Sequence, residues 1–124
     1  TLYAPAGLRG AEICLAFPSV GATETLLLAA ATAQGRTVLH GAAKEPEIVD
    51  LAAFLNACGG CVEGAGTDTI RVQGRRCLAG CTFAPMADRI IASTLACAAG
   101  WNWRAAHPGC MRRCWKFWNK WAAP

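Results

Sequence analysis

The order of glycines and prolines divides this sequence into two similar parts. Gly35 follows an apolar helical pattern and Pro46 opens the next one, and Gly100 and Pro108 repeat this order roughly sixty residues later. Glycine is common just after the end of a helix, and proline is common in the first turn. The sequence therefore predicts a supersecondary unit that occurs twice.

The first predicted unit covers residues 1–79 and alternates strand and helix patterns in the order βαβαββ. Such an order indicates an α/β fold with some antiparallel pairing, of the kind also called α+β. The patterns lie at residues 8–15, 22–34, 37–40, 46–58, 61–63 and 69–72. The second unit, residues 80–124, is a partial βαβα copy with a strand pattern at residues 81–84 and helices from Asp88 and Pro108. We expect this copy to be truncated before a closing hairpin.

The helix at Pro46 carries the clearest local signals. Glu45 and Glu47 place negative charge at the positive end of the helix dipole, a role that needs no chemistry. One apolar stripe at helical spacing is formed by Ile48, Leu51, Ala52 and Leu55. These signals predict an amphipathic helix that packs on a core.

The balance of residue types argues against disorder and against a membrane span. Hydrophobic residues make up 54% of the chain and charged residues 16%, so the chain has enough apolar surface to form a core. The most hydrophobic run, residues 26–33, is far shorter than the ~20 residues that a membrane-spanning helix needs. We find no signal-peptide pattern. We therefore expect a cytoplasmic protein whose eight cysteines are free thiols.

Two features leave other functions open. Cys58, Cys61, Cys77 and Cys81 have a spacing close to that of a four-thiolate zinc site, although small core residues are also wanted there. All five tryptophans lie within residues 101–121 among basic residues, as in a platform for single-stranded nucleic acid or an interfacial membrane helix. An apolar helix face explains that tail more simply. We therefore expect no nucleic-acid or membrane partner, and no metal or cofactor.

A plausible anion site lies where the first strand pattern gives way to the first helix. The connecting residues are Pro18, Ser19, Val20 and Gly21. Free backbone N–H groups at a helix N-terminus carry partial positive charge, and the Ser19 hydroxyl can add a donor. A diphosphate would suit such a site, although an ordinary helix cap has the same pattern.

Four successive motifs resemble those of the UDP-N-acetylglucosamine 1-carboxyvinyltransferases, a family of enolpyruvyl transferases. They are FPSVGATET at residues 17–25, AAKEPEIVDL at 42–51, FLN at 54–56 and GAGTDTIRV at 64–72. The similarity is high over about residues 8–100 and continues weakly to the end of the chain.

The resemblance implies a fold and a reaction. The family fold is an inside-out α/β barrel of two domains, each built from three βαβαββ units, of which this chain would supply one and part of another. The reaction transfers the enolpyruvyl group of phosphoenolpyruvate to the 3′-hydroxyl of UDP-N-acetylglucosamine. It serves peptidoglycan synthesis, and through it cell-wall biogenesis, cell shape, the cell cycle and cell division. A 3-phosphoshikimate enolpyruvyl transferase is the close alternative, but the Glu45-Pro46-Glu47 segment favours the nucleotide-sugar branch.

Carried over by position, the resemblance assigns contact with the uridine diphosphate to Phe17, Pro18, Ser19, Val20 and Gly21. It assigns supporting positions near the cleft to Glu45, Glu47, Asp88 and Arg89. Phe17 stands where relatives have a lysine, so the site keeps its backbone donors but loses one charge.

The resemblance also places key catalytic parts outside this stretch. The cysteine-bearing loop and a lysine–asparagine pair of the family come earlier, and further acidic and arginine residues come later. We therefore assign no catalytic residue here and expect no turnover from these residues alone. The remainder of the parent chain is the expected partner.

Overall fold

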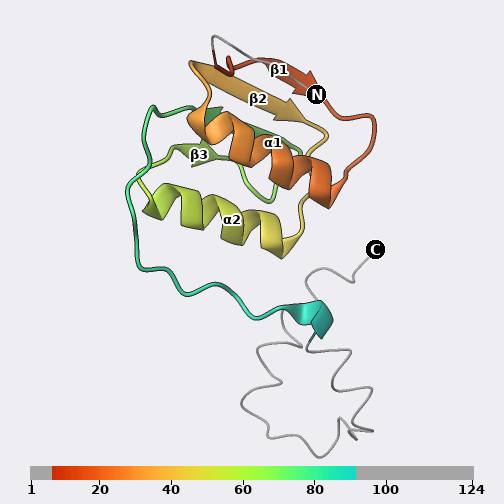
Figure 1. Ribbon diagram of the computed structural model, residues 1–124. Helices are drawn as coiled ribbons and strands as arrows, with labels where there is room; N and C mark the ends of the chain where they lie inside the picture. The colour runs from red at the N-terminus through yellow and green to blue at the C-terminus, as the bar shows by residue number, and fades with distance from the viewer. Residues whose placement is uncertain (1–6, 92–124) are drawn as a thin grey trace, which may run out of the picture. The chain divides into compact units, whose positions relative to one another are not determined.

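The computed structural model describes residues 7–91, and six elements follow one another within the unit formed by residues 1–86 (Figure 1). They are β1 (Glu12–Cys14), α1 (Val20–Thr32), β2 (Arg36–His40), α2 (Pro46–Ala57), β3 (Val62–Glu63) and β4 (Thr69–Gln73). The predicted βαβαββ order is confirmed, and the unit is of the mixed α/β class.

The strands form one mixed sheet in the order β1-β2-β4-β3. β1 pairs with β2 in parallel through the connection made by α1, whereas β4 is antiparallel to both β2 and β3. In this register Leu39 lies opposite Ile13 on one side and Ile70 on the other, and Val72 lies opposite Val62. The alternate residues of neighbouring strands therefore turn the same apolar face to the helices.

Both helices cover that one face of the sheet and run side by side in the same direction (Figure 1). The core between the two layers contains Leu27, Ala30, Ala31, Leu39, Ala42, Ala43, Ile48, Ala52, Leu55, Val62, Ile70 and Val72. Many of these residues are alanines, which let the helix backbones lie close to the sheet. The apolar stripe predicted for α2 is buried at Ile48, Ala52 and Leu55 and partly buried at Leu51.

The helix ends follow the local signals in the sequence. α2 begins at Pro46 after Glu45, whose backbone is extended and whose side chain makes no capping hydrogen bond. Gly59 follows its C-terminal end with a φ of 84°, a left-handed conformation that glycine adopts without strain. Gly35 has a φ of 93° between α1 and β2.

Two predicted strands differ from the structure. The first was predicted over residues 8–15 but covers only Glu12–Cys14, with a single isolated bridge from Arg9 to Gln34 before it. The strand predicted at residues 81–84 is wrong, because these residues form no strand. They follow α2 through side-chain contacts instead of joining a sheet.

The predictions for the rest of the second unit lie largely outside the described residues. Helical structure is present at residues 89–91, where the helix from Asp88 was predicted to start. The helix from Pro108 and the tryptophan-rich tail over residues 101–121 are outside the described range. Within residues 7–91, no helix combines the length and apolar character that a bilayer crossing requires.

Candidate functional site

The first candidate element is the N-terminus of α1. Ser19 is its N-cap residue, with an extended backbone, and its Oγ accepts a hydrogen bond from the Ala22 amide at 3.3 Å. The Ser19 carbonyl accepts from the Thr23 amide at 2.9 Å. The hydroxyl hydrogen of Ser19 is therefore free to point away from the helix, since its oxygen is the acceptor within the cap.

Two amides remain at this end of α1 with no hydrogen-bond partner among the described residues, those of Val20 and Gly21. A Cβ atom built on Gly21 would meet no atom within 4 Å, and Gly21 itself is exposed. The helix start therefore faces open space, and its amides carry the partial positive charge of the helix dipole.

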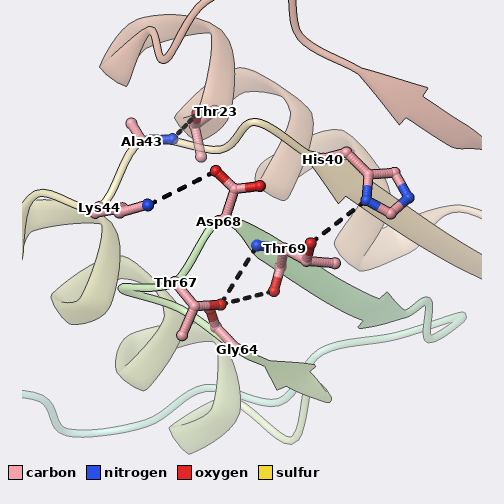
Figure 2. A network of polar contacts seen from close by, with 8 residues as sticks. All are labelled: Thr23, His40, Ala43, Lys44, Gly64, Thr67, Asp68 and Thr69. Carbon is pink, nitrogen blue, oxygen red and sulfur yellow. Dashed lines mark hydrogen bonds and ion pairs between the residues drawn. The ribbon is translucent and has the colours of Figure 1, made fainter.

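A buried threonine links this helix start to the connection between β2 and α2. The Thr23 side chain has no exposed surface. Its Oγ1 donates to the Ser19 carbonyl at 2.8 Å and accepts from the Ala43 amide at 3.1 Å, the second of which Figure 2 shows. Thr23 thus fixes the position of the Ser19 turn relative to residues 41–45, a role that we did not predict. No sequence signal distinguishes Thr23 from Thr25 in the same helix, whose hydroxyl donates to the Gly21 carbonyl at 2.7 Å.

The hairpin between β3 and β4 meets the same connection. The Ala42 amide donates to the Asp68 carbonyl at 3.1 Å. Lys44 Nζ lies 3.6 Å from Asp68 Oδ1, as Figure 2 shows. Thr67 holds the turn by donating its hydroxyl to the Gly64 carbonyl at 2.7 Å. The loop after β2 is therefore held from two sides, by α1 and by the hairpin.

These loops share one edge of the sheet. Residues 15–19 follow β1 and residues 41–45 follow β2, and the two strands are parallel, so both loops leave from carboxyl ends. The Leu15 amide donates to the His40 carbonyl at 2.9 Å at this edge. Ligands of α/β sheets commonly bind outside the carboxyl ends of parallel strands.

Of the four residues predicted to have supporting roles, Glu45 and Glu47 lie at the start of α2, and Asp88 and Arg89 lie at the start of the helical turn at residues 89–91. Glu45 lies on the β2–α2 connection, and its Oε2 is buried without a hydrogen-bond partner among the described residues. Glu47 lies in the first turn of α2. Asp88 caps the helical turn at Arg89, since its Oδ1 accepts from the amides of Ile90 at 2.8 Å and Ile91 at 3.0 Å.

The structure does not assemble the zinc site considered above. Cys58 Sγ and Cys81 Sγ lie 3.2 Å apart, but neither Cys61 nor Cys77 joins them. In the part of the chain that the structure describes, no three His, Cys, Asp or Glu side chains are grouped so that they could hold a metal ion. The two pairs of cysteines lie on either side of the β3–β4 hairpin in the sequence, and only one cysteine of each pair takes part in the sulfur contact.

A histidine on the sheet face away from the helices is held by hydrogen bonds. His40 Nε2 lies 2.8 Å from Glu12 Oε1, and Nδ1 lies 3.4 Å from Thr69 Oγ1 (Figure 2 shows the second contact). These contacts give His40 a structural role between three strands.

Comparison with known proteins identifies the class to which this unit belongs. The family model described as EPSP synthase (3-phosphoshikimate 1-carboxyvinyltransferase) matches residues 2–101. The chain therefore belongs to the EPSP synthase family. The resemblance to enolpyruvyl transferases found in the sequence is confirmed.

Curated relatives named UDP-N-acetylglucosamine 1-carboxyvinyltransferase are similar to the chain within this family. The protein of Nitratidesulfovibrio vulgaris strain Hildenborough is 58% identical over 93 residues, which cover 75% of this chain and 22% of the relative. That of Oleidesulfovibrio alaskensis is 54% identical over 93 residues, with the same coverage. UDP-N-acetylglucosamine 1-carboxyvinyltransferase 1 of Staphylococcus aureus strain N315 is 53% identical over 96 residues, 76% of this chain and 23% of the relative. The matched residues thus span less than a quarter of the length of these relatives.

Proposed function

We propose that this chain is the nucleotide-sugar-binding part of a UDP-N-acetylglucosamine enolpyruvyl transferase, which acts in the cytoplasm in peptidoglycan-precursor synthesis. The observation that supports this most directly is 53–58% identity to relatives of that name over three quarters of the chain. The βαβαββ unit would be one of the repeats of an inside-out α/β barrel, and residues 80–124 would begin the next one.

The proposed ligand contact is the diphosphate of UDP-N-acetylglucosamine at the start of α1. The amides of Val20 and Gly21 have no partner among the described residues, and the Ser19 hydroxyl can donate beside them. Three donors at the positive end of a 13-residue helix suit a doubly charged diphosphate. Phe17 and Pro18 are exposed just before the helix and would border the uridine.

Glu45 would support this site through its charge. A buried carboxylate oxygen without a donor is costly, and a cationic group brought by the rest of the enzyme or by the closed complex would satisfy it. Glu47, Asp88 and Arg89 are proposed as further positioning residues near the cleft. Because Asp88 accepts hydrogen bonds from two backbone amides, part of its contribution would be to hold the start of its own helical turn.

The chemistry that this site would serve is addition followed by elimination. The sugar 3′-hydroxyl gives up its proton to a base outside this stretch, its oxygen forms a bond to C2 of phosphoenolpyruvate, and C3 gains a proton. Loss of a proton from C3 and of phosphate from C2 then restores the double bond between C2 and C3. Residues 17–21 would hold the diphosphate and so orient the 3′-hydroxyl for attack, which is a binding and positioning contribution. No residue of this stretch is proposed as an acid, base or nucleophile.

Amide resonances provide a direct test of the proposed contact. We expect titration of the 124-residue chain with UDP-N-acetylglucosamine to move the Val20 and Gly21 amide signals in an ¹⁵N-correlated spectrum, because new hydrogen bonds to a diphosphate deshield them. A phosphate-release assay on the same chain should show no turnover.

A parallel titration with 3-phosphoshikimate distinguishes the two branches of the family. Larger changes with that ligand would favour the shikimate-pathway alternative. Unchanged Val20 and Gly21 signals with both ligands, at concentrations up to tens of millimolar, would contradict the proposed site.

Restoring a positive charge before α1 should strengthen binding. Phe17 is 69% exposed, so Phe17→Lys loses little packing and adds an ammonium group near the proposed diphosphate. We expect an affinity for UDP-N-acetylglucosamine roughly 3–10-fold higher at low salt, with most of the gain lost at high salt. Phe17→Gln is the matched neutral control. Equal effects of the two substitutions would show that charge at residue 17 is irrelevant.

A further inference from the structure

Two cysteines that are far apart in sequence meet at the C-terminal end of α2. Cys58 is the C-cap residue of this helix and is only 6% exposed, whereas Cys81 is exposed. Their Sγ atoms lie 3.2 Å apart. A disulfide bond is about 2.05 Å long, so the two sulfurs need to approach by only about 1.2 Å to form one.

The backbone around Cys81 is anchored next to Cys58. The Ala79 amide donates to the Cys58 carbonyl at 2.8 Å. Leu78 is partly buried against the core, and its Cδ2 lies 3.6 Å from the position of a Cβ built on Gly60. Cys81 therefore lies only two residues after Ala79, whose backbone is bonded to the end of α2.

The residues after Cys81 continue along the same side of α2 toward its N-terminal half. The ring of Phe83 meets that of Phe54 edge to face, with the centroids 5.5 Å apart. The Met86 amide donates to Asp50 Oδ2 at 3.1 Å. Positions 50, 54 and 58 are one helical turn apart, so three successive turns hold residues 79–86. This pre-positioning lowers the entropy cost of closing a bond between the cysteines.

We propose that Cys58 and Cys81 are a site of reversible oxidation that forms an intramolecular disulfide with low-molecular-weight disulfides as the oxidant. The bond would fasten residues 78–86 to the end of α2. This site is independent of the proposed nucleotide-sugar contact, which lies at the start of α1.

The chemistry is thiol–disulfide exchange in two steps. The Cys81 thiolate attacks one sulfur of an oxidised glutathione molecule, which forms a mixed disulfide and releases one glutathione thiolate. The Cys58 sulfur, having lost its proton to solvent, then attacks the Cys81 sulfur and releases the second glutathione. The protein loses two electrons and two protons, and the oxidant becomes two thiols.

The environments of the two sulfurs set this order. The hydrogen bond with Cys81, and then burial, raise the pKa of the Cys58 thiol. Cys58 is therefore the poorer first nucleophile and is shielded from a bulky oxidant. Cys81 is the accessible partner. Cys61 and Cys77 make no sulfur contact among the described residues, so they serve as internal controls.

The test is disulfide mapping of the full 124-residue chain. The reduced protein is equilibrated with oxidised and reduced glutathione at several ratios, quenched with iodoacetamide and digested with trypsin. Cleavage after Lys44, Arg71, Arg76 and Arg89 yields one peptide with Cys58 and Cys61 and another with Cys77 and Cys81. We expect these two peptides to become linked. The link should persist in the double variant Cys61→Ser/Cys77→Ser and be absent from Cys81→Ser.

Thermal unfolding gives a second readout that does not depend on mapping. The disulfide closes a loop over a sequence separation of 23 residues, and we expect it to raise the Tm of the double variant by roughly 10 °C relative to its reduced form. Cys81→Ser should show no such difference in Tm between oxidised and reduced forms. Because Cys81 is exposed, we expect this substitution to leave the core packing and the fold intact. A glutathione adduct on Cys81 without the link, or links shared equally with Cys61 and Cys77, would overturn the proposal.

Discussion

Replacing Gly21 by aspartate should weaken the binding of UDP-N-acetylglucosamine at least about 10-fold, because it places a carboxylate beside the amides proposed to hold the diphosphate. The fold should tolerate the change. A Cβ atom at this position meets no atom within 4 Å, and an acidic residue in the first turn of a helix is favourable. We therefore expect the Tm of Gly21→Asp to equal or exceed that of the unsubstituted chain.

The matched control for this prediction is Gly21→Asn, which has the same shape without the charge. We expect it to change affinity by no more than about 3-fold. The same decrease in both variants would mean that bulk, and not charge, closes the site. Normal affinity in Gly21→Asp would place the diphosphate away from the start of α1. The affinities are obtained from the amide titration described above or from calorimetry.

Replacing Thr23 by valine should lower the free energy of unfolding by about 2 kcal/mol, the largest effect on stability that we predict. Valine has nearly the same shape as threonine, so the packing inside the unit is kept. The substitution removes the Oγ1 atom that donates to the Ser19 carbonyl and accepts from the Ala43 amide. Because the site is fully buried, the Ala43 amide would have no water to bind in its place.

Urea denaturation under reducing conditions measures this change. Thr23→Ser is the control, since it keeps the hydroxyl and removes one methyl group, at a cost of about 1 kcal/mol. Hydrogen exchange at the Ala43 amide should become much faster in the valine variant than in the serine variant. A serine variant less stable than the valine variant would show that the methyl group, and not the hydroxyl, matters at this position.

Local signals in the sequence were sufficient to predict the elements of the first unit. Pro46 with its flanking glutamates located the start of α2, and Gly59 located its end, because proline and glycine restrict the backbone wherever they occur. The start of α1 was predicted at the Ser19–Gly21 turn for a similar reason. In each case the interactions that begin or end the helix lie within one helical turn of that residue.

Contacts between distant residues could not be predicted in this way. The order of the strands in the sheet depends on which strands pair, and the alternation of apolar and polar residues within one strand does not predict its partner. The cysteine spacing left a metal site open, yet of these four cysteines only Cys58 and Cys81 are in contact, and their contact joins residues 23 positions apart in the sequence. The role of Thr23 depends on its hydrogen bond with the Ala43 amide, 20 residues further along the chain, which the local sequence does not predict. The pattern at residues 81–84 resembled a strand, but it pairs with no strand among residues 7–91.

The alanines between the helices and the sheet also limit how this unit can move. Where small side chains bring two layers into close contact, sliding or tilting one layer soon forces backbone atoms into collision. The sheet and both helices should therefore shift as a rigid body in any movement of the enzyme proposed above. Bending would then be confined to the segments that connect this unit to its neighbours, and substitutions in those segments should alter how fast the unit moves while leaving its fold unchanged.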